Sequence, residues 1–259
     1  MPHALGKTLC SALVFSALLL PQTALAHFGM AIPERDIVED RKDANVNILF
    51  AFAHPMEMQG MNLERPKVFV QDGEGKRTEL KLKETAFLDH KAWSGTHQAA
   101  RPDMTRIVME PSPYFEEAED CFIIHYTKVH VAAYGDEEGW DEPLGLKTEI
   151  VPLTRPVGNW AGGVFQGRVL LDGKPVAGCD VEVEYFNENK AVKPANAHLV
   201  TQVVKTDQNG VFTFVCPIPG WWGFAALNTD SEQMEHKGEK KDVELGAVLW
   251  TRFEPLPGK

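Results

Sequence analysis

Many short stretches of this chain combine β-branched and aromatic residues, in places with hydrophobic and polar residues alternating with a period of two, the pattern typical of half-buried β-strands. The clearest case is Asn45–His54 (NVNILFAFAH), which alternates around β-branched and aromatic residues. Similar stretches follow at 66–83, 105–111 and 120–135, and turn residues such as Asp72-Gly73-Glu74-Gly75 separate them. Stretches with helical periodicity are few, so the sequence predicts an all-β fold.

The pattern continues after a segment rich in proline and glycine at 152–163 (PLTRPVGNWAGG), which is typical of a joint between domains. Strand, Asp-Gly turn and strand signals recur at 163–188 and 199–227, and a last strand is expected at 242–255. The sequence therefore predicts two antiparallel β-sandwich domains, at 27–157 and 158–259. The motif VLLDGKPVAG with TDQNGVFTF makes the second domain resemble a carboxypeptidase-regulatory or transthyretin-like sandwich.

The first 26 residues follow a different pattern, that of a cleavable signal peptide. Lys7 precedes an apolar run at 11–20 (SALVFSALLL), and Ala24-Leu25-Ala26 has the small-x-small form that a signal peptidase cuts. The apolar run is shorter than the roughly 20 residues that span a bilayer. We expect cleavage after Ala26, a periplasmic location and no membrane span in the mature chain.

Composition narrows the function. The chain has a formal net charge of −11, and the predicted leader contains one lysine and no acidic residue. This charge disfavours nucleic acid and anionic lipid as partners and suits the collection of cations. The sequence has no Gly-x-Ser-x-Gly, no phosphate-binding glycine loop, no His-Glu-x-x-His and no Cys-x-x-Cys. We therefore expect a binding protein and not an enzyme.

Histidine is concentrated in the first domain and provides the candidate chemistry. Cleavage would place His27 at the N-terminus, where its α-amine and its imidazole can chelate one ion. Their ordinary pKa values, about 7.7–8.0 and 6.5, allow both groups to lose their protons near neutral pH. A nitrogen-rich site completed by one or two further histidines suits Ni²⁺ or Cu²⁺. The alternative is a frayed chain end.

His54 and one strand histidine are the partners that we expect for His27. His54 ends the first strand and begins the segment HPMEMQGM, whose methionines either bind a soft ion or fill gaps in the core. His125 and His130 are five residues apart on one strand, so they point to opposite faces, and we choose His125. His90 and His97 are weaker candidates, because we expect them in a loop (DHKAWSGTH).

Two other groups of residues are interpreted mainly as structural. The acidic stretch PSPYFEEAEDC reads as a solvated loop. Of the three cysteines that follow the leader, Cys179 and Cys216 share the second domain, and we expect them to form a disulfide in an oxidising compartment. Cys121 would then be left as a buried apolar residue or a soft metal ligand.

Several segments together resemble one family. They are AHF at the mature start, AHPMEMQGM, PYFEEAEDCFIIHYTKV, GWDEPLGLKTEIVPLTRP, VFQGRVLLDGKPVAGCDVEVEYFNE, TQVVKTDQNGVFTFVCPIPGWWGFAAL and ELGAVLW. The resemblance is to the domain-of-unknown-function family described as the periplasmic component of cobalt/nickel transport systems. It implies capture of Ni²⁺ or Co²⁺ and delivery to an inner-membrane permease of an ABC transporter of the energy-coupling-factor type. It supplies no ligand list.

Two alternatives stay open at this stage. A copper-handling protein with Cu²⁺ at an N-terminal His27 site, or an oxidative enzyme that uses this site, is motivated by the same residues. A structural module without a ligand is motivated by the second domain. The metal ligands that we predict are His27, His54 and His125, with His90 and His97 as further candidates.

Overall fold

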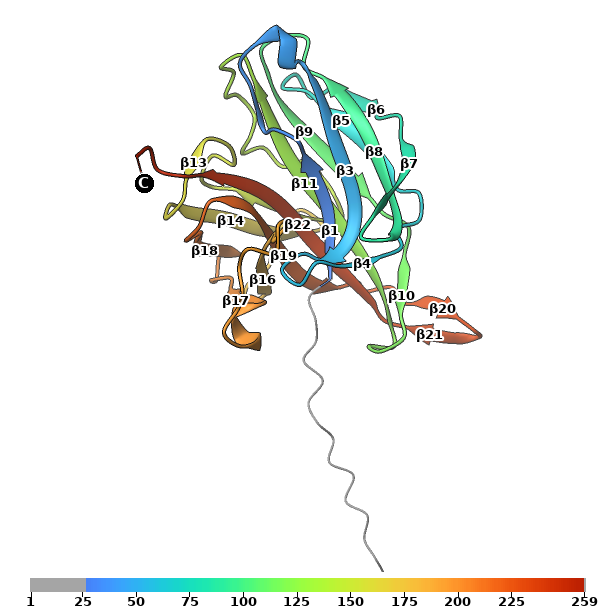
Figure 1. The fold of residues 1–259 in the computed structure, drawn as a ribbon. Helices are drawn as coiled ribbons and strands as arrows, with labels where there is room; N and C mark the ends of the chain where they lie inside the picture. The colour runs from blue at the N-terminus through green and yellow to red at the C-terminus, as the bar shows by residue number, and fades with distance from the viewer. Residues whose placement is uncertain (1–26, 259) are drawn as a thin grey trace, which may run out of the picture.

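The computed structural model describes residues 27–258, and nearly every element in it is a β-strand (Figure 1). The prediction of an all-β sandwich protein is confirmed. The predicted signal peptide lies outside the described residues. Within residues 27–258, no helix has the length and apolar character needed to cross a membrane.

The elements follow one another along the chain as short to medium strands with two 3-10 helices. Their bounds are β1 Phe28–Pro33, β2 Ile37–Val38, η1 Arg41–Asp43, β3 Asn45–His54, β4 Gln59–Met61, β5 Lys67–Gln71, β6 Arg77–Glu79, β7 Lys83–Phe87, β8 His90–Gln98, β9 Asp103–Glu110, β10 Tyr114–Glu116, β11 Cys121–Ala133, β12 Thr148–Pro152, β13 Asn159–Trp160, β14 Val164–Leu171, β15 Lys174–Pro175, β16 Asp180–Tyr185, η2 Ala197–Leu199, β17 Gln202–Lys205, β18 Val211–Val215, β19 Gly220–Thr229, β20 Met234–His236, β21 Glu239–Lys241 and β22 Val243–Glu254.

Three sheets form the layers of the sandwich. A five-stranded sheet has the order β1-β3-β8-β7, with β4 paired to β3. An eleven-stranded sheet has the order β17-β16-β19-β22-β11-β9-β5-β6, with β2, β10 and β13 as short additions. A four-stranded sheet contains β12, β14, β15 and β18, and β20 and β21 form a separate hairpin. The two large predicted strands, at Asn45–His54 and within 120–135, are β3 and β11.

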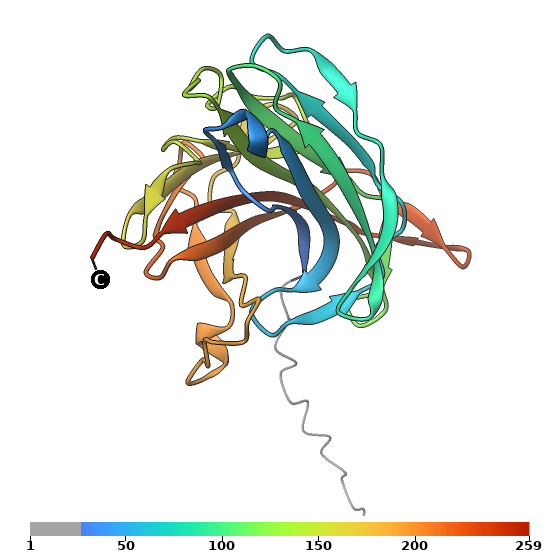
Figure 2. The same ribbon diagram turned by 45° about the horizontal axis from the view of Figure 1, so that its top comes forward.

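The strand β22 connects the two halves of the molecule, and it runs across the middle of it in Figures 1 and 2. It pairs in parallel with β11, from Phe122 opposite Val243 to Val129 opposite Trp250, and antiparallel with β19 on its other side. Most pairs in the structure are antiparallel, as predicted. Among the described residues, the parallel pairs are β11 with β22, which joins the halves, and the two-residue pairs of β2 with β11 and of β13 with β22. The same sheet therefore runs from the first half of the chain into the second.

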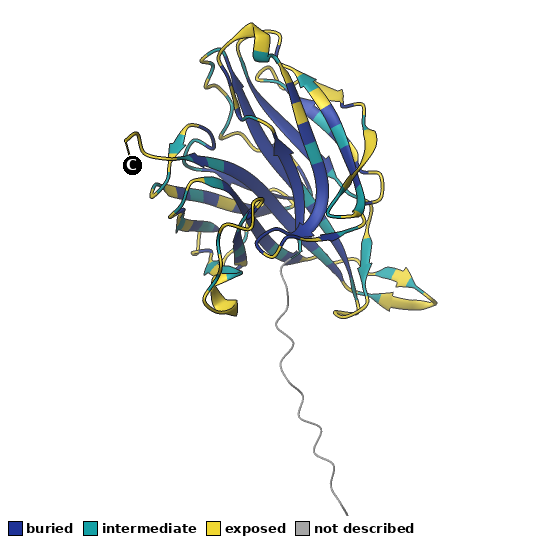
Figure 3. Cartoon of the chain, in the orientation of Figure 1, coloured by how far each residue is buried: buried dark blue, intermediate teal, exposed yellow. Residues whose placement is uncertain are grey.

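Alternate side chains of β22 enter two different cores. Val248 and Trp250 pack into the core beside the five-stranded sheet, and Ala247 and Leu249 pack into the core beside the four-stranded sheet. Successive side chains of a strand point to opposite faces, so one strand serves both cores. Figure 3 shows the resulting pattern, in which strands are buried and exposed residues gather at the turns and at the hairpin β20–β21.

The predicted boundary at residue 157 does not coincide with a break between sheets. β12 precedes it and pairs with β14, which follows it, so the strand before the boundary belongs to the four-stranded sheet. The joint predicted at 152–163 does connect these two strands, and it contains the short β13, which pairs with β22. The boundary itself stays a prediction.

One segment was misread from its sequence. The stretch DHKAWSGTH, expected as a loop, lies largely in the nine-residue strand β8, between β3 and β7. Ala92, Trp93 and Gly95 are buried there, while Ser94 is partly exposed. A Cβ atom at Gly95 would lie 2.7 Å from the Leu80 side chain, so this strand position has no room for a side chain. Close packing at such positions explains why the strand lacks the alternation by which strands are recognised.

The face of β11 that points away from the first core carries a buried polar layer. Lys128 Nζ lies 3.0 Å from Glu149 Oε2, and both side chains are 2% exposed. Glu149 also accepts hydrogen bonds from the backbone N–H groups of Leu144 and Gly145. Burial of such a pair is stable only when the carboxylate and the ammonium stay together.

Candidate functional site

Two of the predicted ligands meet because β1 and β3 are antiparallel neighbours. Phe28 pairs with Ala53, so His27 and His54 follow at the same end of the two strands. Their ring centroids are 4.7 Å apart, with an angle of 49° between the ring planes. The contact between these two histidines therefore follows from the register of the β1–β3 pair.

His125 reaches the same place from the facing sheet. Its β11 neighbours Ile123 and Val129 lie in the first core, so the odd-numbered side chains of this strand point toward β1 and β3. His130 points to the other face, where it is buried beside Arg106 and Lys128. The prediction that the two side chains point to opposite faces is thus confirmed, and the choice of His125 as a ligand stays a prediction.

The Phe52 ring contacts two of the three imidazoles. His27 stacks on its ring, with centroids 5.6 Å apart, and His125 meets it edge-on at 5.7 Å. Phe52 is 6% exposed, so it forms an apolar floor. We call His27, His54 and His125 the three-histidine cluster.

Two carboxylates complete the surroundings of the cluster. Glu116 Oε2, at the end of β10, lies 3.2 Å from His27 Nε2. Glu244 Oε1, on β22, lies 3.3 Å from His125 Nε2. Carboxylates in these positions either orient the imidazoles or become ligands themselves.

The electrostatic balance keeps His27 neutral. Burial first and then the neighbouring His54 lower its pKa to about 4, against the raising effect of Glu116. A neutral imidazole has a free lone pair at neutral pH, as coordination requires. Burial followed by Glu244 and Glu119 raises the pKa of the nearby Cys121 thiol to about 11, so this thiol stays protonated.

Within residues 27–258, no group of three or more His, Cys, Asp or Glu side chains is arranged so that it could hold a metal ion as it stands. The cluster is therefore a set of donors brought together and not a formed cage. The α-amine that cleavage after Ala26 would create belongs to His27, and so to the same cluster.

Two glycines make room for the His125 ring. The N–H of Gly29 points to His125 Nδ1 at 3.4 Å. On the other side, a Cβ atom at Gly246 would lie 2.2 Å from His125 Cδ2. This strand position requires the absence of a side chain, because β22 and β11 are direct neighbours there.

Gly246→Ala is therefore expected to displace the His125 ring and to lower the free energy of unfolding by about 1–3 kcal/mol, the usual cost of overpacking. Urea unfolding of the purified variant measures this loss. In a His125→Ala background the same change should cost much less, since the clashing ring is gone. An equal cost in both backgrounds would show that the clash lies elsewhere.

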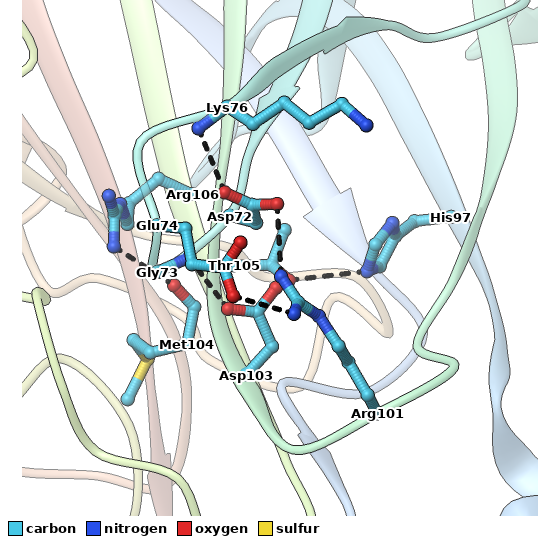
Figure 4. A network of polar contacts seen from close by, with 10 residues as sticks. All are labelled: Asp72, Gly73, Glu74, Lys76, His97, Arg101, Asp103, Met104, Thr105 and Arg106. Carbon is cyan, nitrogen blue, oxygen red and sulfur yellow. Dashed lines mark hydrogen bonds and ion pairs between the residues drawn. The ribbon is translucent and has the colours of Figure 1, made fainter.

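His97 and His90 lie outside the cluster. His97 pairs with Val46 at the start of β3, whereas His54 ends that strand, eight residues later and about 26 Å away at about 3.3 Å per residue. In Figure 4, His97 Nε2 lies 3.3 Å from the Thr105 hydroxyl, which donates to Asp103. Burial lowers the pKa of His97. His90 lies against β4, where a Cβ atom at Gly60 would be 2.9 Å from its Cδ2.

The structure does not join Cys179 and Cys216, which are both buried free thiols. The Cys179 thiol donates to the Leu227 carbonyl at 3.2 Å, and burial raises its pKa to about 11. Burial also raises the pKa of Cys216. The predicted disulfide is thus replaced by two apolar core positions, a use of cysteine that sequence alone does not distinguish from pairing.

The sequence did not identify the two carboxylates. Glu116 belongs to the acidic run that we read as a solvated loop, yet its side chain is 16% exposed. Glu244 reaches His125 through a pairing between strands about 120 residues apart, for which the local sequence has no signal.

Solved structures give only remote likenesses. A pullulanase from Anoxybacillus sp. LM18-11 with bound maltotriose matches at 9% identity and a TM-score of 0.23, over 83% of this chain and 27% of that one. The chain thus spans about a quarter of the pullulanase. The D0-D1 domain of intimin matches at 10% identity and a TM-score of 0.23, over 86% of this chain and 99% of that one. A two-domain fibronectin type III segment of chicken tenascin matches at 8% identity and a TM-score of 0.23, over 87% of this chain and all of that one.

The family comparison is more informative. No curated protein matches the chain. A family model described as a domain of unknown function, DUF4198, matches residues 24–230. This match begins just before His27, and it covers all three members of the three-histidine cluster. The chain therefore belongs to the DUF4198 family.

Proposed function

We propose that this protein is a periplasmic binding protein that captures Ni²⁺ or Co²⁺ and passes the ion to an inner-membrane ABC permease of the energy-coupling-factor type. The observation that carries the proposal is the contact of His27 with His54, with His125 against the same Phe52 ring and Glu116 and Glu244 beside His27 and His125. The choice of nickel or cobalt, and of the permease, is supported by the sequence resemblance.

The chemistry of the donors suits this role. Imidazole nitrogen binds nickel, cobalt, copper and zinc, and the low pKa of His27 keeps its ring available below neutral pH. In a chain that begins at His27, the α-amine would add a second nitrogen from the same residue. The acidic surface would raise the local concentration of cations. Capture and release need only reversible coordination, so no catalytic step is proposed.

Copper handling is the alternative, because most nitrogen sites bind Cu²⁺ more tightly than Ni²⁺. The methionines near His54 do not strengthen it. Met56 and Met58 are 6% and 9% exposed, and Met58 packs in the first core, so their thioethers serve the interior. A structural module without a ligand is the second alternative. In that case the contacts among the histidines would serve packing alone.

The deciding experiment is a titration of Ni²⁺, Co²⁺ and Cu²⁺ into chains that begin at His27 or at an added glycine before it. The added residue removes the amine chelate and leaves all side chains in place. We expect affinity for Ni²⁺ to fall at least tenfold, about 1.4 kcal/mol. His54→Ala should weaken binding similarly, whereas His198→Ala, at an exposed histidine in η2, should have no effect.

Three results would contradict the proposal or the site on which it rests. Binding weaker than millimolar for every ion in all of these chains would remove the binding function. Tight copper binding with ascorbate-driven oxidase activity, and little nickel or cobalt binding, would favour copper handling. Tight binding that depends on neither His27 nor His54 would place the site elsewhere.

A further inference from the structure

The turn that follows His54 is held by the second half of the chain. Residues 55–58 form this turn, which we call the His54 turn, between β3 and β4. Met58 within it has a positive φ of 55°, a backbone conformation that residues other than glycine rarely adopt. Such a turn persists only where surrounding contacts fix it.

Three hydrogen bonds fix the two residues next to His54. The backbone N–H of Met56 donates to Glu184 Oε2 at 3.1 Å. The backbone N–H of Asn187 donates to the Pro55 carbonyl at 3.1 Å, and its side-chain Nδ2 donates to the Met56 carbonyl at 3.1 Å. Both partners come from β16 and the loop after it, about 130 residues along the chain.

Glu184 and Asn187 are themselves immobilised. They are 1% and 5% exposed, so neither has bulk water as an alternative partner. Glu184 also accepts from the Thr201 hydroxyl. The Asn187 side chain exchanges two hydrogen bonds with the backbone of Val192, at 2.9 and 3.0 Å. These contacts make a rigid clamp and not a loose contact at the surface.

We infer that Glu184 and Asn187 are positioning residues that set the place of the His54 imidazole for metal binding; this inference rests on the proposed function. The bonds act on the backbone at the two positions that follow the ligand, where a small shift moves the ring. A buried carboxyl group is a costly way to hold a turn that serves packing alone. Its use here fits a position that must be held accurately, as residues behind metal ligands are.

The inference links the second half of the chain to the affinity of a site that lies mainly in the first. β22 contributes Glu244 to His125, and β16 with its following loop contributes the clamp to His54. The three-histidine cluster is therefore supported from both halves.

The test compares Glu184→Leu and Asn187→Ala with Glu184→Gln, all in the mature chain that begins at His27. Leucine and alanine remove the bonds to the His54 turn, whereas glutamine keeps an acceptor for the Met56 N–H. Glu188→Gln and Asn189→Ala are matched controls, because these exposed residues lie in the same loop. The readouts are Ni²⁺ affinity, the visible absorption spectrum with bound Co²⁺, and hydrogen exchange of the Met56 amide without metal.

We expect Glu184→Leu and Asn187→Ala to weaken Ni²⁺ binding about tenfold, the lower end of effects behind metal ligands. The Co²⁺ spectrum should change, and the Met56 amide should exchange faster. Glu184→Gln and both controls should behave as the wild type in all three readouts. Denaturant unfolding, run in parallel, identifies any variant that fails to fold, and the inference then depends on the remaining variant.

The outcomes separate this inference from the proposed function. If His54→Ala weakens binding while Glu184→Leu and Asn187→Ala bind as the wild type with an unchanged Co²⁺ spectrum, the inference is wrong and the metal site stands. If faster Met56 exchange is seen but no chain binds metal, the clamp exists and the proposed function fails, and with it the positioning role. Loss of binding in the two controls as well would also overturn the inference.

Discussion

Glu149→Gln is expected to lower the free energy of unfolding by about 3–5 kcal/mol, the usual cost of removing one partner from a buried ion pair. The change leaves the Lys128 ammonium in the interior without its carboxylate. It also weakens the acceptor for the Leu144 and Gly145 N–H groups. Burial, and to a smaller extent the positive charge of the nearby Arg106, lowers the pKa of Lys128. Without the Glu149 carboxylate, the repulsion between Arg106 and the Lys128 ammonium is no longer offset.

Chemical denaturation at neutral pH measures this loss, and two further variants control it. Lys128→Met with Glu149→Leu removes both charges, and it should recover much of the lost stability. Asp180→Asn breaks the exposed pair with Lys205, and it should have a small effect because water screens that pair. Unchanged stability of Glu149→Gln would show that Lys128 reaches water in solution.

Stability is also expected to fall as pH rises from about 4.5 to 8, with Glu184 as a main cause. Burial raises the pKa of Glu184 from 4.5 to about 8, against the lowering effect of its hydrogen bonds with Thr201 and Met56. A group whose pKa is raised by folding contributes stability that is complete below the unfolded pKa. That contribution is lost as pH rises through the folded pKa. A tenfold change in an ionisation equilibrium is about 1.4 kcal/mol, so the loss amounts to a few kcal/mol.

The measurement is urea unfolding of the wild type and of Glu184→Gln between pH 4.5 and 9. Glutamine does not ionise, so the difference between the two curves isolates Glu184. Glu182 and Asp36, with pKa values raised by burial to about 7 and about 6, act in the same direction in both proteins. His27, whose pKa is lowered to about 4, acts in the opposite direction between 4 and 6.5. Two parallel curves would mean that Glu184 is ionised at neutral pH.

The sequence was sufficient for elements with strong alternation. β3 has the predicted bounds Asn45–His54, and β11 lies within the predicted stretch 120–135. It failed at β8, where burial of Ala92, Trp93 and Gly95 breaks the period of two that identifies a strand. Burial along β8, which lies between β3 and β7, is uneven, so its buried residues do not fall at every second position.

The candidate site shows the same division. His27, His54 and His125 were chosen from the residue type, the cleavage position and the strand period. The structure places His27 against His54, and His125 against the Phe52 ring on which His27 stacks, while their role as ligands stays a prediction. Glu116 and Glu244 were missed, because their roles depend on which distant strands meet. The expected Cys179–Cys216 bond failed for a similar reason, since pairing requires geometry that spacing along the chain does not contain.

The parallel pairing of β22 with β11 has a consequence for the order in which this protein acquires its structure. The contact between Phe122 and Val243 closes a loop of about 120 residues, and Trp250 fills part of the core beside β1 and β3. The first half of the chain therefore cannot complete its hydrophobic interior until residues 243–250 have been synthesised. Folding is expected to be late and slow, as in other proteins dominated by contacts distant in sequence.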